Sequence, residues 1–226
     1  MLSCFPVKIV AKINPMKKQK YKAQQNEILE KARDLFWEKG YEGTSLKDIA
    51  NACGFENTNV YYYYKNKEDI LFETLRIELD TLVDDTKQLE GNIEKSPVAK
   101  LQAFIYTEVK KHLGEHRLQG MLTDSELSHL NPVHKRKIIE LRNKHDEILS
   151  QIISDGVTQG YFREIDVKLT VYTISSAIIR SRLWFSPTGR VSIQEYADFI
   201  IQFVLHALSA GKIPDSASVG TTGPSR

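Results

Sequence analysis

Apolar residues recur along this chain at intervals of three and four positions, the spacing that lines one face of an α-helix. Between residues 24 and 39, for example, they stand at positions 28, 29, 32, 35 and 36. Prolines and glycines, which interrupt helices, divide these stripes into segments. We expect about nine helices, near residues 24–39, 45–53, 56–64, 67–89, 97–109, 118–130, 132–157, 166–185 and 192–208. The pattern therefore predicts an all-α protein.

Several of these helices have recognisable starts, where a side chain can bond the free N–H groups of the first turn. Ser45 stands three residues before Asp48, and Ser192 stands three residues before Glu195, which is the spacing of a capping box. Ser96 precedes Pro97, and proline is favoured at the first helical position. These signals support helix starts near residues 45, 96 and 192.

Composition narrows the class of protein further. The chain of 226 residues is 41% hydrophobic and 27% charged, a balance typical of folded soluble proteins. No apolar run approaches the roughly 18 residues that a membrane-spanning helix needs, so we expect no membrane contact. Cys4 and Cys53 are the only cysteines and lie far apart, which excludes a disulfide framework. The N-terminus has no secretory pattern, and we expect a cytoplasmic protein.

Residues 40–71 carry the most informative motif, GYEGTSLKDIANACGFENTNVYYYYKNKEDIL. After the helix of residues 24–39, the sequence predicts two short helices separated by Cys53-Gly54. This order of three helices is typical of a tri-helical helix-turn-helix. This stretch resembles the N-terminal DNA-binding domain of the TetR family of transcriptional repressors, and the resemblance covers roughly residues 24–75. The residues that carry it are Gly40-Tyr41, Thr44, Ile49-Ala50, Cys53-Gly54, Tyr61 to Tyr64 and Lys65-Asn66-Lys67-Glu68.

The second short helix of the motif fits the major groove of double-stranded DNA. We expect Asn57, Thr58 and Asn59 to face base edges, because asparagine can pair with adenine and the threonine methyl can contact thymine. We expect Tyr61, Tyr62 and Tyr63 to meet sugar and phosphate, with Tyr62 also near bases. Thr44 and Ser45 at one helix start, and Lys67 at another, suit phosphate groups. Val60 and Tyr64 are expected in the core.

The chain divides into four parts on this interpretation. Residues 1–22 hold six lysines and no acid, and we expect a flexible basic arm, in which Met16 is an alternative start to Met1. Residues 23–68 form the helix-turn-helix domain, and residues 69–210 form a helical regulatory and dimerisation domain. The tail, residues 211–226, is rich in Ser, Gly and Thr and is expected to be disordered.

The family resemblance implies a homodimer on a palindromic operator, released by a small-molecule effector that binds the regulatory domain. The segments at residues 126–132 and 180–192 resemble those of a subgroup that responds to acyl-CoA thioesters, which implies an acyl-CoA or a related carboxylate. The residues expected to line the pocket are Phe72, Leu75, Phe104, Leu122, Ile148, Tyr172, Arg180 and Trp184. Core packing or interface contacts are the alternative role for each of them.

Two other functions remain open from the sequence: a TetR-type regulator of an efflux pump that responds to cationic or hydrophobic drugs, and a nucleoid-associated protein without a ligand. We find no phosphate loop or nucleophile motif, so we expect neither an enzyme nor a cofactor. His112 and His116 have the i, i+4 spacing of metal ligands. Without a recognisable third ligand, a solvated helix face is the favoured interpretation, and we expect no metal.

Overall fold

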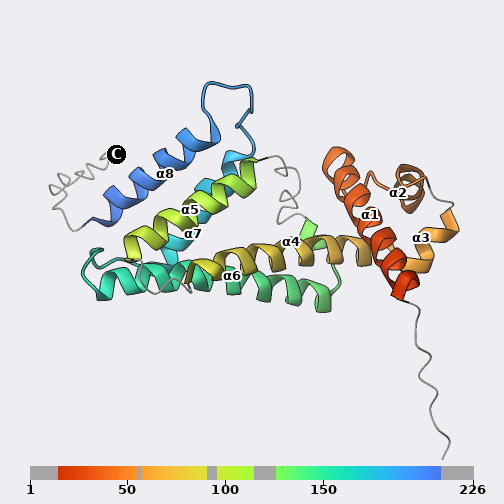
Figure 1. Ribbon diagram of the computed structural model, residues 1–226, viewed down its shortest axis with the longest axis horizontal. Coiled ribbons are helices and arrows are strands. Elements are labelled where there is room, and N and C mark those ends of the chain that lie inside the picture. Colours follow the sequence, from red (N-terminus) through yellow and green to blue (C-terminus); the bar gives the residue numbers. More distant parts are fainter. Residues whose placement is uncertain (1–14, 55–56, 91–95, 115–125, 210–226) are drawn as a thin grey trace, which may run out of the picture. The chain divides into compact units, whose positions relative to one another are not determined.

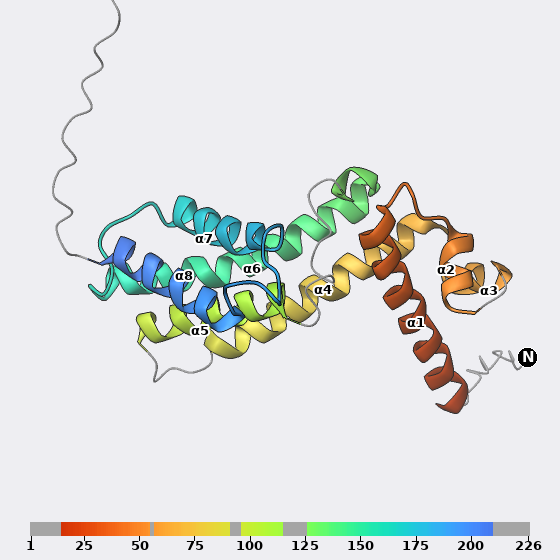
Figure 2. The same ribbon diagram turned by 90° about the horizontal axis from the view of Figure 1, so that it is seen from above.

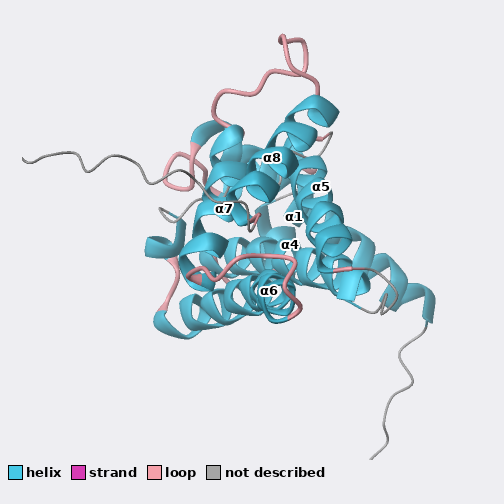
Figure 3. Cartoon of the chain, turned by 90° about the vertical axis from the view of Figure 1, so that its left-hand side faces the viewer, coloured by secondary structure: helices cyan, strands magenta, loops and turns pink. Residues whose placement is uncertain are grey.

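The computed structural model describes residues 15–54, 57–90, 96–114 and 126–209, and this part of the chain is helical with no β-strand (Figure 3). Its eight α-helices are α1 (Pro15–Lys39), α2 (Leu46–Ala52), α3 (Asn57–Tyr63), α4 (Lys67–Glu90), α5 (Pro97–Leu113), α6 (Pro132–Thr158), α7 (Val167–Ser181) and α8 (Ile193–Leu208). A short 3-10 helix spans Glu126–His129. None of the described helices combines the length and apolar content needed to cross a membrane. The expected all-α class is confirmed.

The element boundaries differ from the sequence expectations in three places. Helix α1 begins at Pro15, ahead of the expected start at residue 24, so residues 15–22 of the expected flexible arm are helical. The helix expected at residues 118–130 ends as a 3-10 turn, and its first part lies outside the described residues, as do residues 1–14 and the tail after residue 209. Helix α7 ends at Ser181 in place of Phe185, because residues 182–184 form a turn.

The chain forms two compact units, and each has its own core. Among the described residues, the N-terminal unit contains those up to Asp80 together with residues 126–141, and the C-terminal unit contains residues 81–114 and 142–209. The boundary between the units falls inside α4 and inside α6. A domain boundary at residue 68, which the motif suggested, therefore omits the first part of α4 and residues 126–141 from the N-terminal unit.

The N-terminal unit is built on α1, with α2 and α3 beside it (Figures 1 and 2). Its buried apolar side chains come from every element: Ile28, Leu29, Ala32 and Phe36 of α1, Ile49 and Ala50 of α2, Val60 of α3, Tyr64 directly after α3, Ile70, Leu71, Phe72 and Leu75 of α4, and Leu127, Leu130 and Ile138. Leu127, Leu130 and Ile138, from residues 126–141, thus complete a core that α1 to α4 begin.

The C-terminal unit is a helical bundle in which α5 packs along α8 and α7 (Figures 1 and 2). Its buried residues include Leu101, Ile105, Val109, Leu149, Ile152, Ile174, Ile178, Ile200 and Val204. The Tyr196 hydroxyl donates to Ala177 O at 3.0 Å and joins α8 to α7. Arg163 donates to Leu208 O and Ala207 O, which closes the end of α8.

Gly156 marks the tightest approach in this bundle. A Cβ at this position would lie 2.1 Å from Cδ2 of Phe162, whose side chain is buried. Atoms cannot approach so closely without a shift of the ring or of the backbone. The end of α6 and the turn that follows it therefore depend on a residue without a side chain.

Candidate nucleic-acid interface

The two short helices of the motif are fixed by local signals. Ser45 caps α2, since its Oγ accepts from Asp48 N at 3.1 Å and Asp48 Oδ2 accepts from Ser45 N at 2.8 Å. Gly54 follows α2 with φ of 66°, a left-handed conformation that glycine adopts without steric cost. The expected capping box and the expected turn are both confirmed.

The loop before α2 is held from inside the unit by Thr44. This residue is 1% exposed, and its Oγ1 lies 2.9 Å from Gly40 O and 3.1 Å from Leu35 O. Its hydroxyl therefore bonds the carbonyl groups at the end of α1 and does not face outward. The phosphate contact expected of Thr44 stays a prediction, and the sequence spacing could not show that its hydroxyl is bonded within the unit.

Lys67 holds the same loop from the start of α4. Its Nζ donates to Tyr41 O at 2.6 Å and to Thr44 O at 2.8 Å, and it lies 4.0 Å from the centroid of the Tyr41 ring. Two of its three N–H groups are thus used within the protein. Lys67 orients the loop that carries the α2 N-terminus, and this role was missed in the sequence.

Helix α3 presents two aromatic side chains to solvent. Tyr61 is 58% exposed and Tyr62 is 73% exposed, whereas Val60 and Tyr64 are buried in the core as expected. Tyr63 is half-buried, and its hydroxyl donates to Gln24 Oε1 of α1 at 2.6 Å. The outward face of α3 is therefore formed by Tyr61 and Tyr62, and Tyr63 joins α3 to α1.

The N-terminal extension of α1 lies against this face. The ring centroid of Tyr21 is 4.8 Å from that of Tyr63 and 5.8 Å from that of Tyr62. Lys20 and Lys22, on either side of Tyr21 in the sequence, are exposed. The sequence treated these residues as a mobile arm, so their place beside α3 was missed; the aromatic residue within the lysine run was the available signal.

A shallow, open depression lies at the start of α2. Its volume is about 480 Å³, and its lining residues are Glu42, Thr44, Ser45, Leu46, Lys47, Tyr61 and Lys67. Lys47 is exposed there and was not among the expected contacts. The depression brings together Ser45, Tyr61 and Lys67, three of the residues predicted to contact DNA, and adds Lys47, whose charge is available to a phosphate group.

The ionisable side chains of the N-terminal unit whose pKa values are shifted favour hydrogen bonding and do not provide a reactive nucleophile. Hydrogen bonds from the hydroxyl and the backbone of Ser45 hold the pKa of Asp48 below its ordinary value. Burial raises the pKa of Tyr63 and of Tyr64, and both stay neutral at physiological pH. Burial also raises the pKa of the Cys53 thiol to about 11. Cys53 is therefore protonated and a weak nucleophile.

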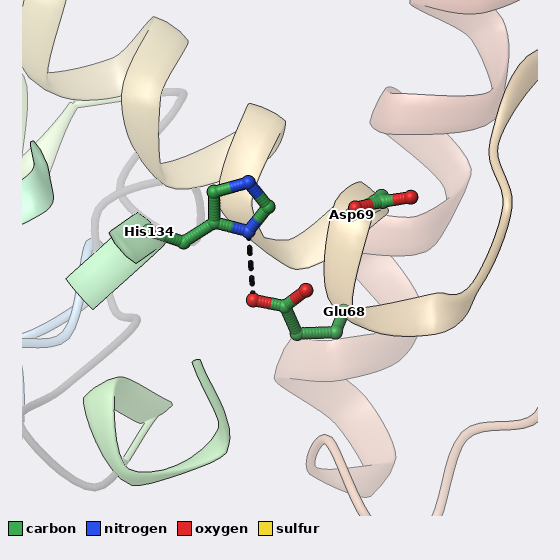
Figure 4. Close-up of side chains that lie close together, drawn as sticks. All are labelled: Glu68, Asp69 and His134. Atoms are coloured by element: carbon green, nitrogen blue, oxygen red, sulfur yellow. Dashed lines mark hydrogen bonds and ion pairs between the residues drawn. The ribbon is translucent and has the colours of Figure 1, made fainter. Parts of the chain in front are cut away.

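Residues 126–141 contact the helix-turn-helix through two histidines. His134 Nδ1 faces Glu68 Oε1 (Figure 4), at a distance of 2.8 Å. The His134 ring also stacks on Phe72, with centroids 3.9 Å apart. Asn131 donates to the same carboxylate through its backbone and its side-chain amide, each at 3.0 Å. His129 stacks on Tyr41, with centroids 4.5 Å apart. This segment is therefore tied directly to the first turn of α4 and to the loop before α2.

Glu68, Asp69 and His134 place three donor groups within 4.8 Å of one another, a spacing that a metal ion can use (Figure 4). The Glu68 carboxylate already accepts hydrogen bonds from Asn131 and His134. The cluster is thus satisfied as a junction between α4 and α6, and we assign no metal to it.

The residues expected to line an effector pocket do not lie in one cluster. Phe72 and Leu75 belong to the core of the N-terminal unit, whereas Phe104 and Ile148 belong to that of the C-terminal unit. Tyr172, Arg180 and Trp184 are exposed, and Leu122 lies outside the described residues. Of the residues expected to line the pocket, Phe104 and Ile148 are thus buried in the core of the C-terminal unit.

A capped helix, a glycine turn and a second helix with an exposed aromatic face, joined to a separate helical unit, define a helix-turn-helix regulator. Residues 28–74 match the family described as bacterial regulatory proteins, tetR family. Residues 94–208 match the family described as Tetracyclin repressor-like, C-terminal domain. The chain belongs to the TetR family of transcriptional regulators, whose members are regulators of transcription and not enzymes.

Individual proteins extend this similarity over most of the chain. The HTH-type transcriptional repressor KstR2 of Mycolicibacterium smegmatis is 27% identical over 190 residues, 83% of this chain and 91% of that protein. The structure of the TetR family regulator PfmR from Thermus thermophilus is 32% identical, covers 79% of this chain and 97% of its own, and gives a TM-score of 0.73. The fold is also that of AibR, solved with isovaleryl coenzyme A and operator DNA, at 24% identity over 80% of this chain and 97% of its own, with a TM-score of 0.74.

The inward position of the Thr44 hydroxyl predicts the behaviour of two substitutions. Thr44→Val should lower the free energy of unfolding by about 1–3 kcal/mol, because buried carbonyl groups lose their donor. Thr44→Ser keeps the hydroxyl and should lose less. Urea denaturation of both variants checks this expectation. A Thr44→Val protein of unchanged stability but reduced DNA affinity would show that the hydroxyl faces phosphate after all.

Proposed function

We propose that this protein is a transcriptional repressor that binds an operator through α3 and is released by a small molecule bound in its C-terminal unit. The observation that carries the proposal is the exposed face of Tyr61 and Tyr62 beside Ser45 and Lys47. An aromatic face on the recognition helix with a lysine of α2 beside it suits the sugar-phosphate backbone. This role places the protein in the cytoplasm, with the chromosome.

Within the proposed interface, base reading falls to the first turn of α3. That turn carries Asn57, Thr58 and Asn59, and the N-terminal residues of a recognition helix are those that contact base edges. Asparagine can form two hydrogen bonds with adenine, and the threonine methyl can contact thymine. Tyr61 and Tyr62, further along α3, then contact sugar and phosphate, as Ser45 and Lys47 do from the start of α2.

This division of roles predicts different effects for two variants. Asn59→Ala should relax base preference at one operator position at a cost of about 1–3 kcal/mol, because one base contact is lost. Lys47→Ala should weaken binding to all sequences alike and lower the salt dependence by about one unit of logarithmic slope. Footprinting on the DNA that flanks the gene, then gel shifts over a salt series, measures both.

Identical behaviour of the two variants would contradict the division between base and phosphate contacts. Absence of any sequence-specific shift at moderate salt would contradict the repressor proposal as a whole. Specific binding that responds to no small molecule would favour a nucleoid-associated role.

A homodimer is the second part of the proposal, and the surface of α7 and α8 supports it. Apolar side chains between 45% and 63% exposed lie on these helices and the turn after α7: Leu169, Tyr172, Ile179, Leu183, Trp184, Phe199 and Phe203. Homodimers are typical of the family, and two such helices from each chain can form a four-helix bundle. A symmetric dimer presents two recognition helices and thus selects a palindromic operator.

Removing two aromatic side chains from this face should separate the subunits. The Phe199→Ser/Phe203→Ser protein should sediment as a monomer and bind the operator more weakly, since each phenylalanine contributes about 1.5–3 kcal/mol when buried. Tyr161→Ser removes an aromatic residue that is 50% exposed outside α7 and α8 and serves as the control. A double variant that stays dimeric would place the interface elsewhere.

The effector we propose is an acyl-CoA or a related carboxylate. The presence of isovaleryl coenzyme A in the AibR structure supports this class of ligand. In the present chain, Phe104 and Ile148 offer a buried apolar environment for an acyl tail, and Arg180 offers an exposed cation for an anionic group. About 3 kcal/mol of differential binding is enough to shift the DNA-bound population by about 150-fold.

A thermal-shift screen tests the effector class. Acyl-CoAs are expected to raise the melting temperature and to release the operator in a gel shift, because a ligand that binds only the folded state stabilises it. Free fatty acids, aromatic acids and cationic drugs provide the comparison. Arg180→Ala should reduce the response to acyl-CoA, with Lys135→Ala as the control. If only cations stabilised the protein, it would be a regulator of a drug-efflux pump.

A further inference from the structure

The first turns of α1 form a basic segment on the surface of the N-terminal unit. Its sequence, PMKKQKYK at residues 15–22, contains four lysines and no acid. Lys20 and Lys22 are exposed, and among the described residues neither forms an ion pair or a hydrogen bond. The whole chain has a formal net charge of only +2, although residues 1–22 hold six lysines and no acid. The excess positive charge of the chain is therefore concentrated in this region.

Tyr21 fixes the basic segment against α3. Its ring centroid lies 4.8 Å from that of Tyr63, and it meets Tyr62 edge to face with centroids 5.8 Å apart. The Tyr63 hydroxyl also donates to Gln24 Oε1, about one helical turn after Tyr21. Side chains from two successive turns of α1 thus bind α3, and the segment has a defined place beside it.

Helical geometry sets the two exposed lysines around this contact. Successive residues of an α-helix are rotated by about 100° about its axis, so Lys20 and Lys22 leave the helix on opposite sides of Tyr21. Tyr21 packs against Tyr62, whose side chain is 73% exposed and belongs to the outward face of α3. A lysine therefore stands on each side of an aromatic contact that borders this outward face.

We propose that Lys20 and Lys22 bind phosphates of the DNA backbone beyond the base pairs that α3 reads, and that Tyr21 positions them. The inference rests on the DNA-binding function proposed above and extends its surface from α2 and α3 to α1. A basic segment without acids complements the phosphates of a duplex, and such contacts require no particular sequence. Tyr63 ends α3, so the lysines stand at the opposite end of α3 from its first, base-reading turn.

The salt dependence of operator binding tests the inference. Each phosphate contact contributes about 0.9 to the slope of the logarithm of affinity against the logarithm of salt concentration. Lys20→Gln/Lys22→Gln removes both charges with little change in helix propensity. In gel shifts over a salt series, this variant should lower the slope by about 3.6 for a dimer that loses two contacts in each subunit. Lys20→Arg/Lys22→Arg keeps both charges and should retain the slope.

Lys135→Gln/Lys137→Gln is the matched control, because these two lysines of α6 are also exposed and also stand two residues apart. The control removes the same charge from the chain and should leave the slope unchanged. It thus separates a local contact from an effect of net charge. Circular dichroism should show that all variants keep the helical fold.

Ethylation interference locates the contact on the duplex. Ethylated phosphates outside the base pairs read by α3 should weaken binding of the unaltered protein, and this interference should disappear with Lys20→Gln/Lys22→Gln. Tyr21→Ala should reproduce both effects, because the lysines lose their position, whereas Tyr21→Phe keeps the ring and should not. A Tyr21→Ala protein of lower stability but unchanged slope would contradict the positioning role.

The outcomes separate this inference from the repressor proposal. Equal salt slopes for the unaltered protein and Lys20→Gln/Lys22→Gln would overturn the inference, while specific operator binding by both would leave the repressor proposal standing. If the unaltered protein selects no operator, the repressor proposal fails and a non-operator duplex at low salt decides the lysine contact, since phosphate contacts need no sequence. A lower slope for the variant on that duplex supports the contact, and an equal slope refutes it.

Discussion

The placement of α2, and with it the whole outward face of the helix-turn-helix, depends on the carbonyl groups of one loop. Thr44 bonds the end of α1 from within, while Lys67 binds Tyr41 O and Thr44 O from the start of α4. A buried polar group left without a partner costs about 1–3 kcal/mol, so these two side chains stabilise the loop that precedes α2. Because both side chains are used in this way, the phosphate contacts that we propose from this loop are assigned to Ser45 and Lys47.

Glu68 connects the first turn of α4 to the start of α6. Its carboxylate lies one residue after Lys67 and accepts from Asn131 and His134, so the loop, the first turn of α4 and the start of α6 form one bonded chain. The start of α6 is therefore connected to the loop before α2 through the first turn of α4. A regulator that must change the position of its recognition helix can use such a connection as its mechanical link.

The sequence was sufficient wherever the partners are close in the chain. The capping boxes at Ser45 and Ser192, the Ser96 cap and the burial of Val60 and Tyr64 depend on spacings of three and four residues, and all were predicted. The inward turn of Thr44, the use of Lys67 and the contact of Glu68 with His134 were not. Thr44 bonds Leu35 O nine residues away as well as Gly40 O, and the partners of Lys67 and Glu68 lie between 23 and 66 residues away. Periodicity within one helix cannot show which of these distant groups converge.

The membership of residues 126–141 in the N-terminal unit bears on how such regulators evolve and are recombined. A hybrid joined after residue 68 would exchange Leu127, Leu130 and Ile138 for unrelated residues and leave part of the helix-turn-helix core without its cover. Specificity for DNA and specificity for an effector thus cannot be exchanged as two consecutive pieces of sequence. A functional exchange has to transfer residues 126–141 together with the residues up to Asp80. The DNA-binding unit is therefore compact in the fold but discontinuous in the sequence.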